Sequence, residues 1–359
     1  MCGPDHMMTK RFRRDIYRRI LTIIMAGAVM LLLSSCRGSA RQQDIESLSE
    51  KYAVPGDRQL IVYTSHKEEV YMPIIREFEE RTGIWVELHT GGTTQMFDEV
   101  RQVMPDSGCD IMFGGGIESY EASKDLFMPF EAKEKDVIDA AYVDPDNLFT
   151  AFTELPIVFV YNKKLVSYSE VPKSWEELFD ERWKGQIAFA DIHNSGTSYT
   201  ILSTMSQLFD ETPDTLVERF VAQLGGRILA SSGNVIPKVS DGEFLIGITL
   251  EETARKAMEQ GGDISMLYPS DGTSAVPDGV AIVKNAPHSY NAGRFIDFVV
   301  GYDTQRYVED NFYRRSVRTD IAHTGYGVMK RMDFDLRESS SSMEEVFLIW
   351  DEKTGREGE

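Results

Sequence analysis

Residues 60–81 read LIVYTSHKEEVYMPIIREFEER, and this stretch decides the fold. It opens with an apolar run at 60–63, which predicts a short buried strand. A polar turn follows, and then Val70, Ile74 and Phe78 recur at the spacing of one helical face. A strand joined to a helix by a short turn is the repeating unit of α/β folds, in which helices connect parallel strands. The stretch therefore predicts an α/β protein.

The same alternation of strand and helix continues along the chain. Further strands are expected at 84–88, 111–113, 157–161, 186–190, 227–230, 244–249, 264–268 and 280–283. Helices are expected at 94–103, 175–179, 199–208, 215–224, 252–260, 291–299 and 342–352. A mature chain of about 320 residues is longer than most chains that fold around a single hydrophobic core, so two domains are expected.

The N-terminal residues are expected to be an export signal. Basic side chains at 10–19 precede an apolar run at 20–33, which is shorter than the ~20 residues that span a bilayer as a helix. This order is typical of a secretory signal peptide. Residues 33–36, LSSC, resemble the lipobox of bacterial lipoproteins. That resemblance implies cleavage before Cys36 and attachment of lipid to it.

We therefore expect a signal peptide at 1–35 and a lipidated cysteine with a tether at 36–58. The protein would be exported and anchored to the membrane through the lipid on Cys36, in the periplasm or at the cell surface. The alternative is an uncleaved membrane anchor with a chance cysteine. The Arg18-Arg19 pair suggests twin-arginine export, but its flanking residues fit that signal poorly.

The chain is strongly acidic, with a formal net charge of −20 at pH 7. Residues 1–35 hold six basic and two acidic side chains, so their removal would leave −24. Such a charge argues against nucleic acid and anionic lipid as partners, and an anionic ligand would need a local site. Once Cys2 is removed and Cys36 carries lipid, Cys109 is alone, so no disulfide within the chain is expected.

Polar residues that could bind a ligand follow the predicted strands. In open α/β sheets, ligands bind beyond the carboxyl ends of the strands, where helix N-termini offer free N–H groups and a positive dipole end. Glycine and hydroxyl residues there let the backbone approach a ligand and donate hydrogen bonds. The candidates are Ser65, His66, Gly92, Thr93, Gly115, Gly116, Ser195, Gly196, Thr197, Ser198, Ser232, Asn234, Glu251 and Glu252.

Each candidate also has a purely structural interpretation. Ser and Thr at helix starts are common N-caps, and glutamates there interact favourably with the positive end of the helix dipole. The glycines at 114–116 could form only a tight turn, and His66 could lie on the surface. The chain has no H-E-x-x-H, G-x-S-x-G or G-x-x-x-x-G-K-[ST] motif, and its histidines lack metal-ligand spacing. The sequence therefore predicts no enzyme, no metal site and no cofactor.

Short motifs run through the body in a fixed order. They are Ile61-Val62-Tyr63, His66-Lys67-Glu68, Asp110-Ile111-Met112-Phe113, Tyr161-Asn162-Lys163-Lys164-Leu165, Trp183-Lys184-Gly185-Gln186-Ile187, Ser195-Gly196-Thr197-Ser198-Tyr199, Asp241-Gly242-Glu243, Tyr268-Pro269, Asp271-Gly272-Thr273, Pro277-Asp278-Gly279-Val280-Ala281 and Phe295-Ile296-Asp297-Phe298. Each is modest, but together they resemble the extracellular solute-binding proteins of ABC importers, in the group that binds ferric iron, hexose phosphates and phosphoglycerate. The likeness covers roughly residues 58–335.

The resemblance implies a type II periplasmic-binding-protein-like fold. Such a fold has two α/β lobes with a ligand-binding cleft between them. Lobe I would comprise residues 59–154 and 278–359, including the C-terminal helices, and lobe II residues 155–277. The chain would cross between the lobes near 155–161 and 277–283.

The resemblance also bears on the ligand. The iron branch holds its metal with adjacent tyrosines at the place of Glu251 and Glu252, and with a glutamate after the strand at 111–113, where this chain has glycine. No ferric site is therefore expected, despite His66. The two glutamates of this chain instead suit hydroxyl or amine groups of a ligand.

The turn of Ser195, Gly196 and Thr197 matches the place where family members grip phosphate. Ser232 and Asn234 are weaker candidates for the same cradle. The expected function is that of the solute-binding lipoprotein of an ABC importer, with a small phosphorylated organic anion as the solute. A sugar phosphate, a phosphoglycerate or an aminophosphonate would fit.

The expected partners are this solute and the permease and ATPase of the importer, with the protein acting as a monomer. Within the same fold, the alternatives are a carboxylate, a polyamine or ferric iron as the ligand. Among other functional classes of protein, the alternatives are a sensor that presents its ligand to a membrane kinase and a hydrolase of phosphate esters.

Overall fold

The computed structural model describes residues 54–209 and 211–356. The predicted signal peptide, Cys36 and most of the predicted tether lie outside these residues. Within the described part of the chain, no helix is long and apolar enough to cross a membrane. The described residues from Gly56 onward belong to one unit, which is built on two main sheets.

The first sheet combines segments that are far apart in the sequence. Its strands are β1 (Gln59–Thr64), β2 (Trp85–Thr90), β3 (Ile111–Gly116), β4 (Phe127–Met128), β5 (Thr150–Ala151) and β11 (Asp278–Val283). They lie in the order β2-β1-β3-β11-β4, and β5 pairs with β11. The first three strands are parallel, but β11 is antiparallel to β3. The sheet is therefore mixed, although the sequence predicts parallel strands.

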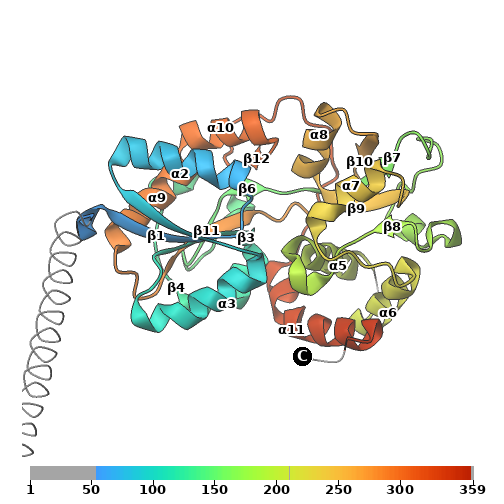
Figure 1. Cartoon of the computed structure of the whole chain (residues 1–359), viewed down its shortest axis with the longest axis horizontal. Coiled ribbons are helices and arrows are strands. Elements are labelled where there is room, and N and C mark those ends of the chain that lie inside the picture. The colour runs from blue at the N-terminus through green and yellow to red at the C-terminus, as the bar shows by residue number, and fades with distance from the viewer. Residues whose placement is uncertain (1–53, 210, 357–359) are drawn as a thin grey trace, which may run out of the picture. The chain divides into compact units, whose positions relative to one another are not determined.

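Helices cover both faces of this sheet. One face carries α2 (Glu68–Thr82), α9 (Ser289–Val300) and α10 (Tyr302–Phe312), and the other carries α3 (Thr93–Val103) and α4 (Ile117–Ala122) (Figure 1). On β1, Val62 packs with Phe78 and Phe295, whereas the next residue, Tyr63, packs with Phe97 on the opposite side. Successive side chains of a strand point to opposite faces, so a strand buried on both sides is apolar throughout. We call this sheet and its helices the first lobe.

The second lobe is built on β10-β7-β9-β8, with β7 (Ile157–Asn162), β8 (Ile187–Ala188), β9 (Ile246–Leu250) and β10 (Ile264–Leu267). β7 is antiparallel to both of its neighbours, and β8 is parallel to β9. Two buried clusters cover the two faces of β7, one around Phe159 and one around Val160. The helices are α5 (Gly196–Leu208), α6 (Pro213–Leu224), α7 (Val235–Ser240) and α8 (Glu251–Glu259).

A short ladder lies where the chain crosses between the lobes. It pairs β6 (Thr153–Glu154) with β12 (Arg315–Ser316) in antiparallel fashion. β6 comes just before β7, and β12 lies between α10 and α11, so both strands of the ladder belong to segments that lead from the first lobe to the second. Short 3-10 helices occupy Gly56–Arg58, Met104–Asp106, Lys124–Leu126, Lys135–Val137, Ala140–Tyr142, Glu176–Phe179, Glu181–Trp183, Ile192–Asn194 and Ser232–Asn234.

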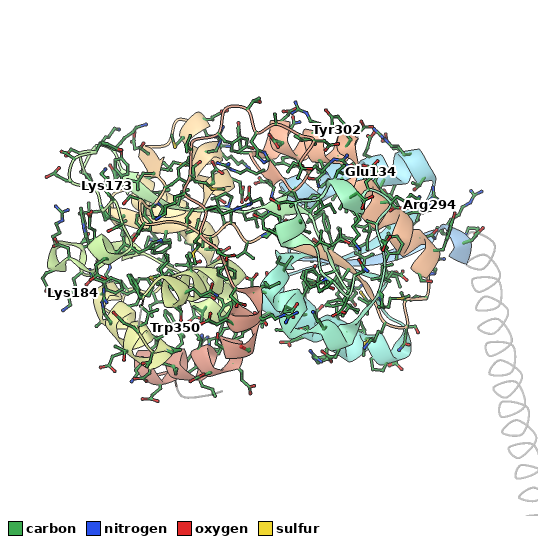
Figure 2. The ribbon with its side chains drawn as sticks, turned by 180° about the vertical axis from the view of Figure 1, so that it is seen from behind. Glu134, Lys173, Lys184, Arg294, Tyr302 and Trp350 are labelled. Atoms are coloured by element: carbon green, nitrogen blue, oxygen red, sulfur yellow. The ribbon has the colours of Figure 1, made fainter. Side chains whose placement is uncertain are left out.

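The last helix, α11 (Leu336–Thr354), differs from the expectation that the C-terminal helices belong to lobe I. Its buried Val346 and fully buried Trp350 are part of the core of the second lobe, together with residues of α5 and α6. Figure 2, in which Trp350 is labelled, shows this helix from behind. Lys353 at the end of α11 also pairs with Asp214 and Glu218 of α6. The apolar stripe of α11 therefore packs in the core of the second lobe, while Leu336 at its start packs against the first-lobe cluster that includes α4.

One predicted strand is absent, and the alternative of a tight turn at 114–116 does not hold. Residues 227–230 form no strand, and only Leu229 makes an isolated bridge to Ala190. Gly114 to Gly116 do not form a turn but are the end of β3, with positive φ angles of 100° at Gly114 and 84° at Gly115. Such angles suit glycine, and they let the strand continue to the edge of the sheet.

Candidate functional site

A cleft of about 450 Å³ lies between the two lobes and is lined by residues of both. Its lining residues are Ser65, His66, Lys67, Val70, Gly92, Thr93, Gly115, Gly116, Leu155, Asn194, Ser195, Gly196, Thr197, Thr200, Ser231, Ser232, Gly233, Thr249, Leu250, Glu252, Thr253, Val276, Asp278 and Arg314. Most of these side chains are small or hydroxylic. The cleft can therefore offer many hydrogen bonds and close backbone approach to a small polar ligand.

The first wall comes from three loops that follow parallel strands. Because β1, β2 and β3 are parallel, their carboxyl ends meet at one edge of the sheet. This edge contributes all six residues predicted for this lobe, namely Ser65, His66, Gly92, the first residue of α3, Thr93, and the last two residues of β3, Gly115 and Gly116. A Cβ at Gly115 would lie 2.7 Å from Thr93 Cγ2, so the close approach of two loops requires this glycine.

The second wall is formed by the start of α5, the 3-10 turn at Ser232–Asn234 and the start of α8. Five residues predicted for this lobe line the cleft, namely Ser195, Gly196, Thr197, Ser232 and Glu252. The structure thus brings eleven of the fourteen predicted residues around one cleft.

The N-termini of α3 and α5 approach each other across this cleft. Gly92 precedes α3 and Ser195 precedes α5, and a Cβ at Gly196 would lie 3.4 Å from Thr93 Oγ1. Both helices are long enough to carry a macrodipole, with 11 residues in α3 and 13 in α5. Their unpaired N–H groups and positive dipole ends favour an anion between them.

Ser195 is an N-cap as well as a cleft residue. Its Oγ accepts a hydrogen bond from the Ser198 backbone N–H at 3.1 Å. A hydroxyl that accepts one hydrogen bond can still donate its own proton, so capping and ligand binding are compatible at this position. Ser198 itself is buried beneath the turn and does not line the cleft, which corrects its prediction as a ligand contact.

Two further predicted residues lie away from the cleft. Asn234 is exposed at the end of its 3-10 turn and does not line the cleft. Glu251 is buried, and its carboxylate accepts hydrogen bonds from Arg315 Nε at 2.7 Å and Arg315 Nη2 at 3.2 Å. Tyr268 also donates to it. Glu251 therefore belongs to an internal ion pair, because its position on α8 faces β12.

Glu252, by contrast, faces the cleft. Its Oε1 accepts a hydrogen bond from Thr253 Oγ1 at 2.7 Å and lies 3.8 Å from Lys67 Nζ on the opposite wall. The two neighbouring glutamates of α8 therefore have different surroundings, because Glu251 is held in the ion pair with Arg315 and Glu252 lines the cleft. Glu252 is thus placed to meet a hydroxyl or amine group of a ligand.

Arg314 also lines the cleft and is not among the predicted residues. Its side chain is 5% exposed, and its Nη2 lies 2.9 Å from Asp278 Oδ2. Asp278 is held in turn by the N–H and Oγ1 of Thr153, at 2.8 and 2.7 Å from its Oδ1. Arg314 follows α10 directly and belongs to no strand-turn-helix unit. The pattern that located the other candidates could therefore not point to it.

His66 adds no positive charge to the cleft. Its ring lies edge-on to Phe113, with the ring centroids 4.3 Å apart, and its Nδ1 is 3.4 Å from Arg314 Nη1. Burial, followed by the nearby Arg314, lowers the pKa of His66 well below its usual value. The ring is therefore neutral at pH 7, and the cationic groups of the described cleft are Arg314 and Lys67.

The chain is similar to known proteins over most of its length. Residues 98–324 match the family described as bacterial extracellular solute-binding protein. Iron uptake protein A1 of Synechocystis is 25% identical over 331 residues, which cover 88% of this chain and 89% of that relative. A putative 2-aminoethylphosphonate-binding periplasmic protein of Salmonella typhi is 22% identical over 256 residues, covering 68% of this chain and 73% of that relative.

Among solved structures, a similar one is the periplasmic binding protein AfuA of Actinobacillus pleuropneumoniae with fructose-6-phosphate bound. Its TM-score is 0.76 at 22% identity, and the match covers 83% of this chain and 99% of AfuA. A likeness at this level of identity shows the two-lobe fold and does not by itself identify a ligand. The expectation of a periplasmic-binding-protein-like α/β fold is thereby confirmed.

Proposed function

This chain belongs to the bacterial extracellular solute-binding proteins, which serve import systems of the ABC type, and we propose that its solute is a small phosphorylated organic anion. The observation that carries the proposal is the meeting of two helix N-termini, from α3 and α5, in a cleft that also contains Arg314. Backbone N–H groups, hydroxyls and a guanidinium together match the oxygens of a phosphate or phosphonate group.

The overall charge of the protein makes this local site necessary. With a formal net charge of −20, the chain as a whole repels anions. A cleft that binds an anion must therefore supply its own positive potential. Arg314 and Lys67 are balanced by Asp278 and Glu252 in the same cleft, so this potential would come from the two helix ends. The remainder of the solute would meet Glu252 and Thr253, which suit a hydroxyl or an amine. Sugar phosphates and aminophosphonates have both features.

The proposal is tested by calorimetric titration with a panel of solutes. The panel contains fructose 6-phosphate, 2-aminoethylphosphonate, 3-phosphoglycerate, inorganic phosphate, citrate, spermidine and ferric citrate. We expect one of the first three to bind most tightly. Tight binding of citrate or spermidine alone would contradict the phosphate assignment, and turnover of a phosphate ester would contradict the role as a binding protein.

Ferric citrate addresses the relatives that are named for iron. The described residues that line the cleft include no tyrosine, and no group of three or more His, Cys, Asp or Glu residues in the described chain could hold a metal ion. Ferric ion prefers hard oxygen donors such as phenolate and carboxylate. We therefore expect no coloured charge-transfer complex of fixed stoichiometry. Such a complex would indicate that the protein binds ferric iron and would contradict the phosphate assignment.

We also propose that a lipid on Cys36 attaches the protein to the membrane. If Cys36 carries lipid, radiolabelled palmitate should enter the wild-type protein and not Cys36→Ala. One acyl chain gives only marginal membrane binding, so more than one chain is expected on the mature protein. Equal labelling of the two proteins would exclude a lipid on this residue.

A further inference from the structure

Glu118 on α4 lies beneath the floor of the cleft and joins the two lobes. It is 1% exposed, and its Oε1 lies 2.6 Å from Thr200 Oγ1 on α5. Thr200 and Gly116 both line the cleft, and a Cβ at Gly116 would overlap the Glu118 carboxylate. Thr200 and Gly116 therefore lie between this carboxyl group and the cleft.

The Thr200 hydroxyl faces two oxygens but has only one proton. Besides Glu118 Oε1, the backbone carbonyl oxygen of Gly196 lies 3.0 Å from Thr200 Oγ1. Serine and threonine in helices commonly donate to the carbonyl four residues earlier. The short contact between Thr200 and Glu118 then needs a proton from the carboxyl group. A neutral Glu118 that donates to Thr200 Oγ1 satisfies both contacts.

The second oxygen of Glu118 supports the same assignment. Among the described residues, Oε2 has no hydrogen-bond partner, and an ionised carboxylate in such a place is unfavourable. Burial raises the pKa of Glu118 to about 7, although the contact with Thr200 and the backbone N–H of Glu118 itself act in the opposite direction. The hydroxyl geometry and the burial thus agree on a neutral carboxyl group near pH 7.

No charged side chain of the described neighbours faces Glu118. From α5, Tyr199 is the titratable neighbour, and its pKa is raised chiefly by burial and slightly by Glu118. On β11, Asp278 is directed to Arg314 and Thr153, and β3 ends in glycines. On α11, the helix that also packs on α4, buried Ser339 is flanked by the exposed residues Arg337 and Glu338.

We propose that Glu118 is protonated where the two lobes meet, and that separation of the lobes at Thr200 releases this proton. When Thr200 moves away, water from the cleft reaches the carboxyl group. Its pKa then returns toward the ordinary value of about 4.3. The protein would therefore take up a proton as it closes, and Glu118 would act as a positioning residue that makes closure depend on pH.

The sign of the effect follows from these two states. Because the pKa of Glu118 is higher in the closed form, closure is favoured as the pH falls below about 7. The ratio of closed to open molecules should rise by up to about tenfold per pH unit until the ordinary pKa of a free glutamate is reached. Well above pH 7, Glu118 is ionised in both forms, so its contribution to the ratio of closed to open molecules no longer changes with pH.

The test needs no solute, so its outcome is independent of the proposed function. Infrared titration of the protein should show a protonated carboxyl signal that disappears near pH 7 and is missing in Glu118→Gln. Small-angle scattering should show the radius of gyration of the wild type increasing between pH 5.5 and 8.5. Glu118→Gln, in which a neutral amide replaces the neutral acid, should stay compact throughout this range.

Glu121→Gln is the matched control, because it makes the same change of charge on the same helix at a residue that pairs with Lys124 at 2.8 Å. It should retain both the carboxyl signal and the response of the wild type to pH. The proposal is overturned if the wild type shows no carboxyl titration near pH 7, or if Glu118→Gln expands with pH as the wild type does. If Glu118→Gln does not fold, the wild-type titrations decide alone.

Discussion

Two neighbouring helices of the second lobe, α5 and α6, begin in nearly the same way. Ser195 caps α5 by accepting a hydrogen bond from the Ser198 N–H, and Thr212 caps α6 by accepting one from the Thr215 N–H. Judged by the cap alone, the two helix starts are equivalent, with Ser or Thr in the usual place. Only the start of α5, however, lies in the cleft.

The difference appears in the first turn. α6 carries Asp214 there, and this carboxylate balances the positive end of its own helix while it pairs with Lys353 at 3.1 Å. The first turns of α5 and α3 contain no acidic residue. Helices commonly place Asp or Glu in this turn because it stabilises them. The comparison indicates that a helix N-terminus that lies in a cleft and has no acidic residue in its first turn can bind the anionic group of a ligand.

The largest effect is expected when an acidic residue is placed in the first turn of α5, at the position that Asp214 occupies in α6. Thr197 occupies the second position of α5, as Asp214 does in α6. We expect Thr197→Asp to weaken phosphate binding by about a hundredfold or more, because like charges placed together cost several kcal/mol. The melting temperature should stay equal or rise, since the acid favours the helix dipole. Calorimetric titration with the tightest phosphorylated solute, together with thermal melts, measures both effects.

The next largest effect is expected at Arg314. Loss of a buried charge-assisted contact typically costs 2–5 kcal/mol, so Arg314→Gln should lower affinity by about a hundredfold. The variant also leaves Asp278 buried without its cation, which should lower the melting temperature. Adding Asp278→Asn should restore stability but not affinity. If this double variant binds as tightly as the wild type, Arg314 has no direct role in binding.

The cap residues give a smaller and sharper contrast. If Ser195 donates to a charged oxygen, Ser195→Ala should lose about 1.5–3 kcal/mol of binding, or about ten- to hundredfold in affinity. Both Ser195→Ala and the matched control Thr212→Ala should lose about 1 kcal/mol of stability as N-caps. The control should bind like the wild type. Equal affinities in the two variants would mean that Ser195 is a cap and nothing more.

The smallest effect is expected for the reverse exchange. Asp214→Thr makes α6 resemble α5 and removes an ion pair in which Asp214 is 56% exposed. Exposed pairs contribute about 0–1 kcal/mol, so a small fall in the melting temperature and no change in affinity are expected. A measurable gain of phosphate binding at α6 would show that an open helix start is sufficient without the cleft.

Most elements of the fold could be predicted because their signals are local. The strand predicted at 60–63 matches β1 within one residue, and the predicted helical face of Val70, Ile74 and Phe78 lies on α2, since hydrophobic spacing acts over a few residues. The direction of the strands could not be obtained in this way. β11 is antiparallel to β3 because it returns from a crossing between the lobes, and that path depends on the whole chain.

In the candidate site, too, some residues could be located from local sequence signals and others only from the tertiary structure. Loops that follow strands could be located, and eleven of their predicted residues meet at one cleft. Glu251 and Glu252 are chemically identical neighbours, and only the position of Arg315, distant in sequence, decides which of them is buried in an ion pair. Arg314 and Glu118 belong to no recognisable pattern. Their roles follow only from partners brought together by the tertiary structure.

The packing of α11 has a consequence for how the protein is made. The core of the second lobe includes Trp350, and the first sheet includes β11, which begins at Asp278. A chain still emerging from the ribosome can therefore complete neither core until late in its synthesis, because domains fold as units once their parts are present. Both lobes therefore fold only after most of the chain has been made, and the two cores are completed by segments that lie far from the N-terminus in the sequence.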